Sequence, residues 1–135
     1  MYTLNANDLH NSFSLKEAKM RWTNLRKQVY EMIKSNHKPM CANEISSNIL
    51  NYDLSNIYRT IKVLGEEGLI NSLTVSGSNF YFVGAGHFLC CKKCKVLFNF
   101  DKCVGHNIVD SLEKEFDFVI NNHVLLFEGY CKNCR

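Results

Sequence analysis

Four of the seven cysteines form two pairs with the spacing of metal ligands, Cys91-Lys-Lys-Cys94 and Cys131-Lys-Asn-Cys134. Two thiolates separated by two residues can bind one zinc ion from a single tight turn, and two such pairs complete a tetrahedral shell. An odd number of cysteines fits a disulfide framework poorly. We therefore predict a structural zinc site whose binding contributes directly to the free energy of folding.

The same pairs leave two alternatives open. A thiol-based redox or peroxide-sensing protein could use them as dithiols, although no thioredoxin-like βαβ pattern surrounds either pair. A zinc-stapled module that binds another protein is the second alternative. Hydrolysis is not indicated, because a zinc ion bound by four thiolates leaves no position for water. We therefore expect no enzymatic activity and no small-molecule substrate. Strand alternation predicts that Cys90 faces away from Cys91, into the core.

The cysteine pairs must be positioned by a small domain that spans residues 87–135. The gap between Cys94 and Cys131 is longer than in a common zinc ribbon, so it must hold further elements. Hydrophobic patterns predict strands near 87–91, 96–100 and 118–128, and a helix near 102–115. A domain of about 50 residues gains from a metal staple, because its core is small.

The preceding residues have helical periodicity followed by a strand pattern. A weak first helix is predicted within residues 1–18, and clearer helices end near Ser35, Leu50 and Leu64. Two apolar runs, at 69–75 and 79–83, flank the turn signal Ser76-Gly77-Ser78. Helices followed by a hairpin are typical of a winged helix-turn-helix, in which the helix before the hairpin lies in the DNA major groove.

These patterns predict an α+β fold with two domains. Residues 1–83 form a winged-helix DNA-binding domain, Gly84-Ala85-Gly86 is a hinge, and residues 87–135 form a small α/β dimerisation domain with the zinc site.

Composition sets only broad limits on the kind of protein. A net charge of +3 permits a nucleic-acid partner, and 46% hydrophobic residues suffice for a core. No apolar run approaches the roughly 18 residues that a membrane span needs. No signal peptide is recognisable, so we expect a cytoplasmic protein that does not bind membranes.

Two sets of residues together resemble the ferric uptake regulator family. Tyr58-Arg59, within the segment 54–64 and followed by Gly68-Leu69-Ile70, is similar to the family's recognition helix. Cys91-x-x-Cys94-x-Val96 and His123-x7-Cys131-x-x-Cys134 are similar to its dimerisation domain. The resemblance covers roughly residues 20–135. It implies a homodimeric, metal-responsive repressor of metal-homeostasis or metal and oxidative-stress genes, which binds A/T-rich inverted repeats when it is loaded with metal.

The resemblance also implies the residues that contact DNA. Tyr58 would contact a base edge, such as a thymine methyl group, and Arg59 would contact phosphate. The further candidates on this basis are Asn56, Thr60, Lys62 and Arg26.

A second metal site is implied at three histidines. His87, His106 and His123 stand where the family has ligands inside its dimerisation domain, and Cys103 lies one helical turn before His106. Imidazole and thiolate ligands favour zinc, cobalt, nickel or copper over manganese, and iron stays among the candidates. The alternative is three unrelated histidines.

The chain departs from the family at the usual sensing site between the two domains. His37 lies two residues from one of these positions and could replace a ligand only if its loop shifts. We therefore predict that this site is absent or rebuilt. The residues at the family's ligand positions are Pro39, Phe82, Gly86, Phe88 and Asn99.

Overall fold

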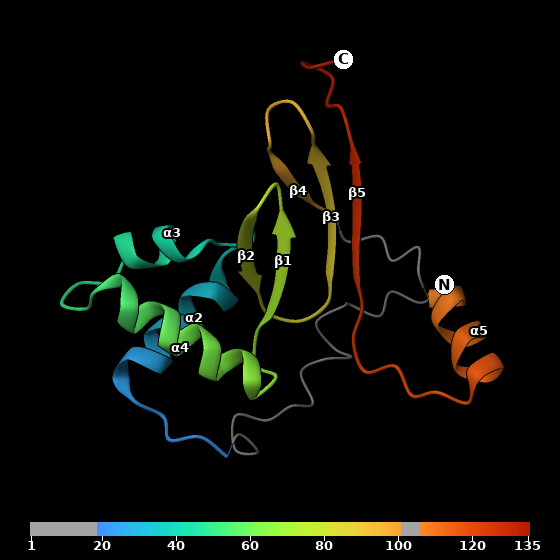
Figure 1. The fold of residues 1–135 in the computed structure, drawn as a ribbon. Coiled ribbons are helices and arrows are strands. Elements are labelled where there is room, and N and C mark those ends of the chain that lie inside the picture. Colours follow the sequence, from blue (N-terminus) through green and yellow to red (C-terminus); the bar gives the residue numbers. More distant parts are fainter. Residues whose placement is uncertain (1–18, 101–105) are drawn as a thin grey trace.

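The computed structural model describes residues 19–100 and 106–135. The helix expected within residues 1–18, and Cys103, lie outside the described residues. Within them, three helices are followed by a two-stranded hairpin, and then by a three-stranded sheet with one more helix (Figure 1). The α+β fold class is thereby confirmed.

The helices α2 (Asn24–Ser35), α3 (Ala42–Ser47) and α4 (Leu54–Glu66) form the first core. The side chain of Thr23 accepts a hydrogen bond from the amide of Arg26, and Asp53 accepts one from the amide of Asn56. Such N-caps satisfy backbone donors that a helix leaves without partners. Each helix then buries one apolar face, as the sequence periodicity predicts.

The predicted hairpin is confirmed as β1 (Asn71–Val75) and β2 (Ser78–Phe82), which pair in antiparallel register. The turn between them places Ser76 and Gly77 at positive φ. Met40, just before α3, exchanges two backbone hydrogen bonds with Tyr81 of β2 at 2.8 and 2.9 Å. The hairpin is therefore attached to the helices as the wing of a winged helix-turn-helix.

The second sheet has the order β4-β3-β5, formed by β4 (Leu97–Asn99), β3 (Gly86–Cys91) and β5 (Val124–Gly129). β4 is antiparallel to β3, whereas β5 is parallel to it. Parallel neighbours require a crossover connection, and this one includes the helix α5 (His106–Phe116). The strand predicted near 118–128 begins only at Val124.

The helix α5 lies to one side of the sheet, away from α2, α3 and α4 (Figure 1). It has no buried residue, and its apolar side chains Ile108, Leu112 and Phe116 are exposed. None of the helices among the described residues is both long and apolar enough to cross a membrane.

Candidate metal centre and nucleic-acid interface

The four paired cysteines meet at one end of the second sheet. Because β3 and β5 are parallel, their C-terminal ends lie at the same edge of the sheet. Cys91 is the last residue of β3 and Cys94 follows it, while Cys131 and Cys134 follow the end of β5. The four Sγ atoms lie within 4.8 Å of one another, and Cys94 Sγ is 3.9 Å from Cys131 Sγ. Tetrahedral zinc, with Zn–S bonds of about 2.3 Å, requires sulfurs about 3.8 Å apart. The cluster therefore fits a structural zinc ion.

Hydrogen bonds from backbone amides lower the pKa of one cysteine in this cluster. The amide of Cys131 donates to Cys91 Sγ at 3.5 Å, and this bond, with those from the amides of Cys94 and Lys93, lowers the pKa of Cys91 to about 6. These hydrogen bonds therefore favour the thiolate form of Cys91, which is the form that binds zinc. The hydrogen bond between Cys134 and Cys131 raises the pKa of Cys134 to about 12, so metal binding must release its proton.

Two of the three predicted histidine ligands come together in the same sheet. His87 is the second residue of β3 and is only 5% exposed, while His123 directly precedes β5. The parallel register, with His87 beside Leu125, brings their Nε2 atoms to 2.9 Å from each other. Their rings stack at 5.1 Å, and His87 also stacks on Phe100 at 5.5 Å.

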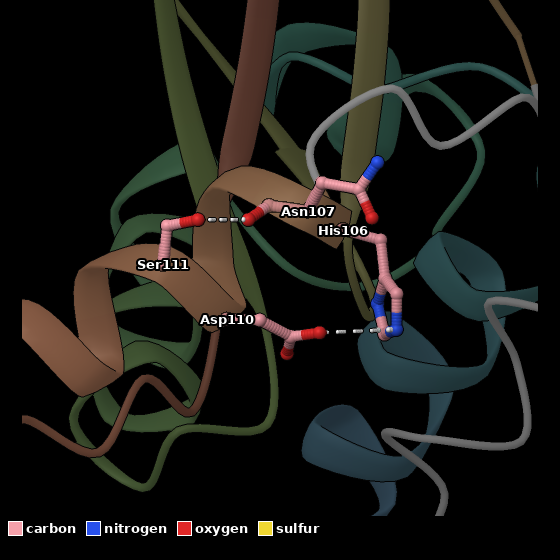
Figure 2. Close-up of polar contacts among 4 residues, drawn as sticks. All are labelled: His106, Asn107, Asp110 and Ser111. Carbon is pink, nitrogen blue, oxygen red and sulfur yellow. Dashed lines mark hydrogen bonds and ion pairs between the residues drawn. The ribbon is translucent and has the colours of Figure 1, made fainter.

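His106 does not join this pair. It begins α5 with its side chain 66% exposed, and its Nε2 lies 3.9 Å from a carboxylate oxygen of Asp110. Figure 2 shows this pair one helical turn apart, beside the hydrogen bond from Ser111 Oγ to the Asn107 carbonyl. Sequence reasoning missed Asp110, although its i,i+4 spacing from His106 was legible.

Within the described ranges, only the four cysteines form a closely spaced group of three or more metal-ligating side chains. The three-histidine site, with or without Cys103, stays a prediction.

The exposed face of α4 carries the predicted DNA contacts. Tyr58 is 50% exposed, and Arg59 and Lys62 are also exposed. Tyr58 and Lys62 line an open groove of about 540 Å³ between α4 and the hairpin. Arg59 Nη2 donates to Asn56 Oδ1 at 3.1 Å, which orients the guanidinium along the helix. Three side chains capable of contacting phosphate or bases therefore share one surface.

Two other candidates are placed differently. Thr60 is only 6% exposed, because its spacing of three from Ile57 and four from Leu64 puts it on the core face of α4. This burial leaves Thr60 little surface for direct contact with DNA, so the residue is left out of the interface proposed below. Arg26 Nη1 donates to the carbonyl of Arg21 at 2.7 Å, which holds the guanidinium against the chain entering α2.

The family's interdomain ligand positions do not fit a metal ion. The rings of Phe82 and Phe88 contact each other at 5.0 Å with an interplanar angle of 70°. The side-chain amide of Asn99 donates to the backbone carbonyl of His37. Neither ring has a ligand atom, and the Asn99 side chain is already engaged through its NH₂ group.

Comparisons with known proteins agree with this description. A profile of the Ferric uptake regulator family matches residues 17–128. The peroxide-responsive repressor PerR of Staphylococcus epidermidis is 27% identical over 129 residues, which cover 90% of this chain and 86% of that protein.

Solved structures show the same fold at lower identity. The ferric uptake regulator of Pseudomonas aeruginosa, determined with manganese, is 18% identical with a TM-score of 0.75, covering 91% of this chain and 98% of that one. The regulator of Vibrio cholerae is also 18% identical, with a TM-score of 0.68 and coverages of 90% and 99%. Since the matched profile spans most of the sequence, the chain belongs to the ferric uptake regulator family, whose members are dimeric DNA-binding repressors that respond to metal ions or peroxide.

Proposed function

We propose that this protein is a homodimeric repressor whose affinity for an A/T-rich inverted repeat depends on a transition metal bound near His87 and His123. The observation that carries the proposal is the 2.9 Å approach of the two Nε2 atoms beside a separate four-cysteine cluster. One site suits structural zinc. The other offers imidazole ligands to a second metal, which could be zinc, cobalt, nickel, copper or iron.

The proposed DNA interface is the exposed face of α4. Tyr58 would read a base edge, and Arg59 and Lys62 would neutralise phosphates. Asn56 would support the position of Arg59 through their hydrogen bond. Because each neutralised phosphate releases counterions, operator affinity should fall steeply as the salt concentration rises.

Unpaired apolar surface supports the dimer. Ile108, Leu112 and Phe116 are exposed on α5, and Phe98 and Phe127 are exposed on the sheet. Large apolar side chains exposed together on one helix or one sheet face usually mark a protein interface. We propose that the second subunit covers it, which supports the assignment of residues 87–135 as the dimerisation domain.

The second metal would need ligands beyond the histidine pair. His106 and Asp110 lie one turn apart on α5, so the helix can supply an imidazole and a carboxylate from one face. We propose that α5 completes the site with His106, and that Cys103 is a further candidate. A metal ion that binds the DNA-competent dimer more tightly than other conformations shifts the population toward it.

The proposal can be tested by fluorescence anisotropy on a labelled A/T-rich inverted repeat. Protein that retains only the cysteine-bound zinc is compared with the same protein after addition of Zn²⁺, Co²⁺, Ni²⁺, Cu²⁺ or Fe²⁺. At least one of these ions should raise the affinity by about tenfold or more, which is a typical coupling between two ligands. The His87→Ala and His123→Ala variants should lose that increase, whereas His37→Ala should keep it. An equal increase in all three variants would place the responsive metal elsewhere.

A second candidate, a peroxide-responsive repressor, is favoured by the name of the curated relatives. Hydrogen peroxide would then release the protein from DNA, and mass spectrometry of tryptic peptides would identify the oxidised residue. Cys90 is a poor candidate for that residue, because burial raises the pKa of its thiol. Either function places the protein with DNA in the cytoplasm, and neither requires an enzymatic activity.

A further inference from the structure

A second apolar core joins the wing to the dimerisation sheet. Leu73, Val75 and Phe82 of the hairpin pack with Phe88 and Cys90 of β3 and with Leu97 of β4, and all six are at most 8% exposed. Buried apolar contacts of this kind oppose separation of the two domains.

Gly86 lies at the centre of this contact. A Cβ atom on Gly86 would lie 2.3 Å from the ring of Phe88 and 2.8 Å from the ring of Phe82. Because real Cβ atoms do not approach other carbons so closely, only glycine allows both rings to close over the backbone. We call Phe82, Gly86 and Phe88 the aromatic junction.

Polar contacts border the aromatic junction. Asn99 of β4 donates its side-chain amide to the carbonyl of His37, in the segment between α2 and α3. The side-chain amide of Asn71 donates to the carbonyl of Gly84 at 2.7 Å. The first bond links the two domains directly, and the second fixes the connecting segment on which a hinge would depend.

The three residues of the aromatic junction and Asn99 occupy positions where the family resemblance implies ligands of an interdomain metal site. Phenylalanine and glycine side chains carry no ligand atom, and Asn99 presents a donor to a carbonyl instead of an oxygen to a cation. The described residues at this place therefore supply an alternative set of contacts rather than an incomplete ligand shell.

We propose that the aromatic junction and the Asn99–His37 hydrogen bond replace the interdomain metal, and hold the DNA-binding domain against the dimerisation sheet without a cation. The relative position of the two domains then does not respond to metal at this place. Any metal response must act through the histidine pair or the dimer. This inference goes beyond the proposed function and does not depend on DNA binding.

Hydrogen–deuterium exchange followed by mass spectrometry tests the proposal on the full-length dimer with its cysteine-bound zinc. The Phe88→Ala variant should exchange the amides of β1 and β2 at least about tenfold faster than the unmodified chain, because removal of the ring opens the shared core. Phe118→Ala removes an exposed ring from the segment after α5, outside the aromatic junction, and is the matched control. It should leave that exchange unchanged. Equal rates for Phe88→Ala and the unmodified chain would overturn the proposal.

The absence of a junction metal is tested in the His123→Ala background, where the histidine pair cannot bind an ion. Added Zn²⁺, Co²⁺ or Fe²⁺ should leave exchange in residues 36–40 and 97–100 unchanged. Slowing by tenfold or more would overturn the proposal.

If Phe88→Ala does not fold, Asn99→Ala removes one surface hydrogen bond instead. It should speed exchange in residues 36–40, and unchanged exchange there would contradict the proposal. None of these measurements uses DNA, so failure of the proposed function would be seen separately.

Discussion

The Nε2 atoms of His87 and His123 lie 2.9 Å apart, although the histidines are 36 positions apart in the sequence. A hydrogen bond between them requires one imidazole to donate and the other to accept, and a bound cation requires both nitrogens to be unprotonated. The pair therefore suits a metal site whose ligands must lose a proton to bind.

Substitution of either histidine should remove the second metal ion and leave the zinc ion in place. His87→Ala and His123→Ala each delete one of the two facing nitrogens, whereas the cysteine cluster is untouched. Metal content per chain, measured by inductively coupled plasma mass spectrometry on untagged protein, checks this. The control is His37→Ala, which should keep both ions. Retention of the second ion in both histidine-pair variants would rule out this site.

Cys94→Ser should release zinc and loosen the end of the second sheet. Cys94 Sγ lies 3.9 Å from Cys131 Sγ, and loss of one thiolate from a structural site removes folding free energy along with the metal. The readouts are zinc content and hydrogen exchange in β3 and β5. Zinc retained at one ion per chain with unchanged exchange would refute a structural role.

Cys41→Ser is the control for the loss of a thiol. Cys41 is the N-cap of α3 and makes no side-chain capping bond. Serine can accept a hydrogen bond from the first turn, so this variant should keep its zinc and gain about 0.5–1 kcal/mol in the free energy of unfolding. Denaturant titration measures the difference.

Gly86→Ala should destabilise the protein, and Gly65→Ala should not. At Gly86 the added methyl group meets both rings of the aromatic junction, and overpacking of this kind costs about 1–3 kcal/mol. Gly65 lies inside α4 with no other group within 4 Å of an added Cβ, so alanine should gain up to about 1 kcal/mol from helix propensity. Urea unfolding of both variants, followed by far-UV circular dichroism, compares them. Equal stabilities would contradict the close packing described at Gly86.

Tyr58→Ala and Arg59→Ala should each weaken operator binding by about 1–3 kcal/mol, with different signatures. Loss of Tyr58 should relax preference at one base position. Loss of Arg59 should weaken binding to all DNA sequences alike. It should also reduce the slope of the binding constant against salt concentration by about one counterion. Lys114→Ala removes a charge from the last turn of α5 and serves as the control. Anisotropy titrations at several salt concentrations separate these effects, and a loss of the same size in Lys114→Ala would indicate nonspecific electrostatics.

Local patterns were sufficient to predict the helices, the hairpin and the cysteine cluster. A cap such as Asp53, an apolar stripe and a C-x-x-C turn all involve residues within a few positions of each other. The burial of Thr60 also follows from a local pattern, since its spacing from Ile57 and Leu64 places it on the core face of α4.

Features that depend on long-range packing were not predictable from the residues alone. The pairing of β3 with β5 brings His123 to His87, and nothing near either histidine specifies a parallel register. The glycine content of the segment 84–86 predicts a hinge. In the structure Gly86 belongs to β3 and is buried against the rings of Phe82 and Phe88. In a sequence, a glycine required for close packing cannot be distinguished from one required for flexibility. Mobility of this segment stays a prediction.

Selection from a random duplex DNA library tests the central claim most directly. The dimer would be used with its zinc alone and again with the second metal, and the bound DNA would be sequenced. Metal-dependent, sequence-specific repression predicts that an A/T-rich inverted repeat is enriched only with the second metal present, and that Tyr58→Ala loses this enrichment. Recovery of no preferred sequence, or of the same sequence to the same extent without the second metal, would contradict the account.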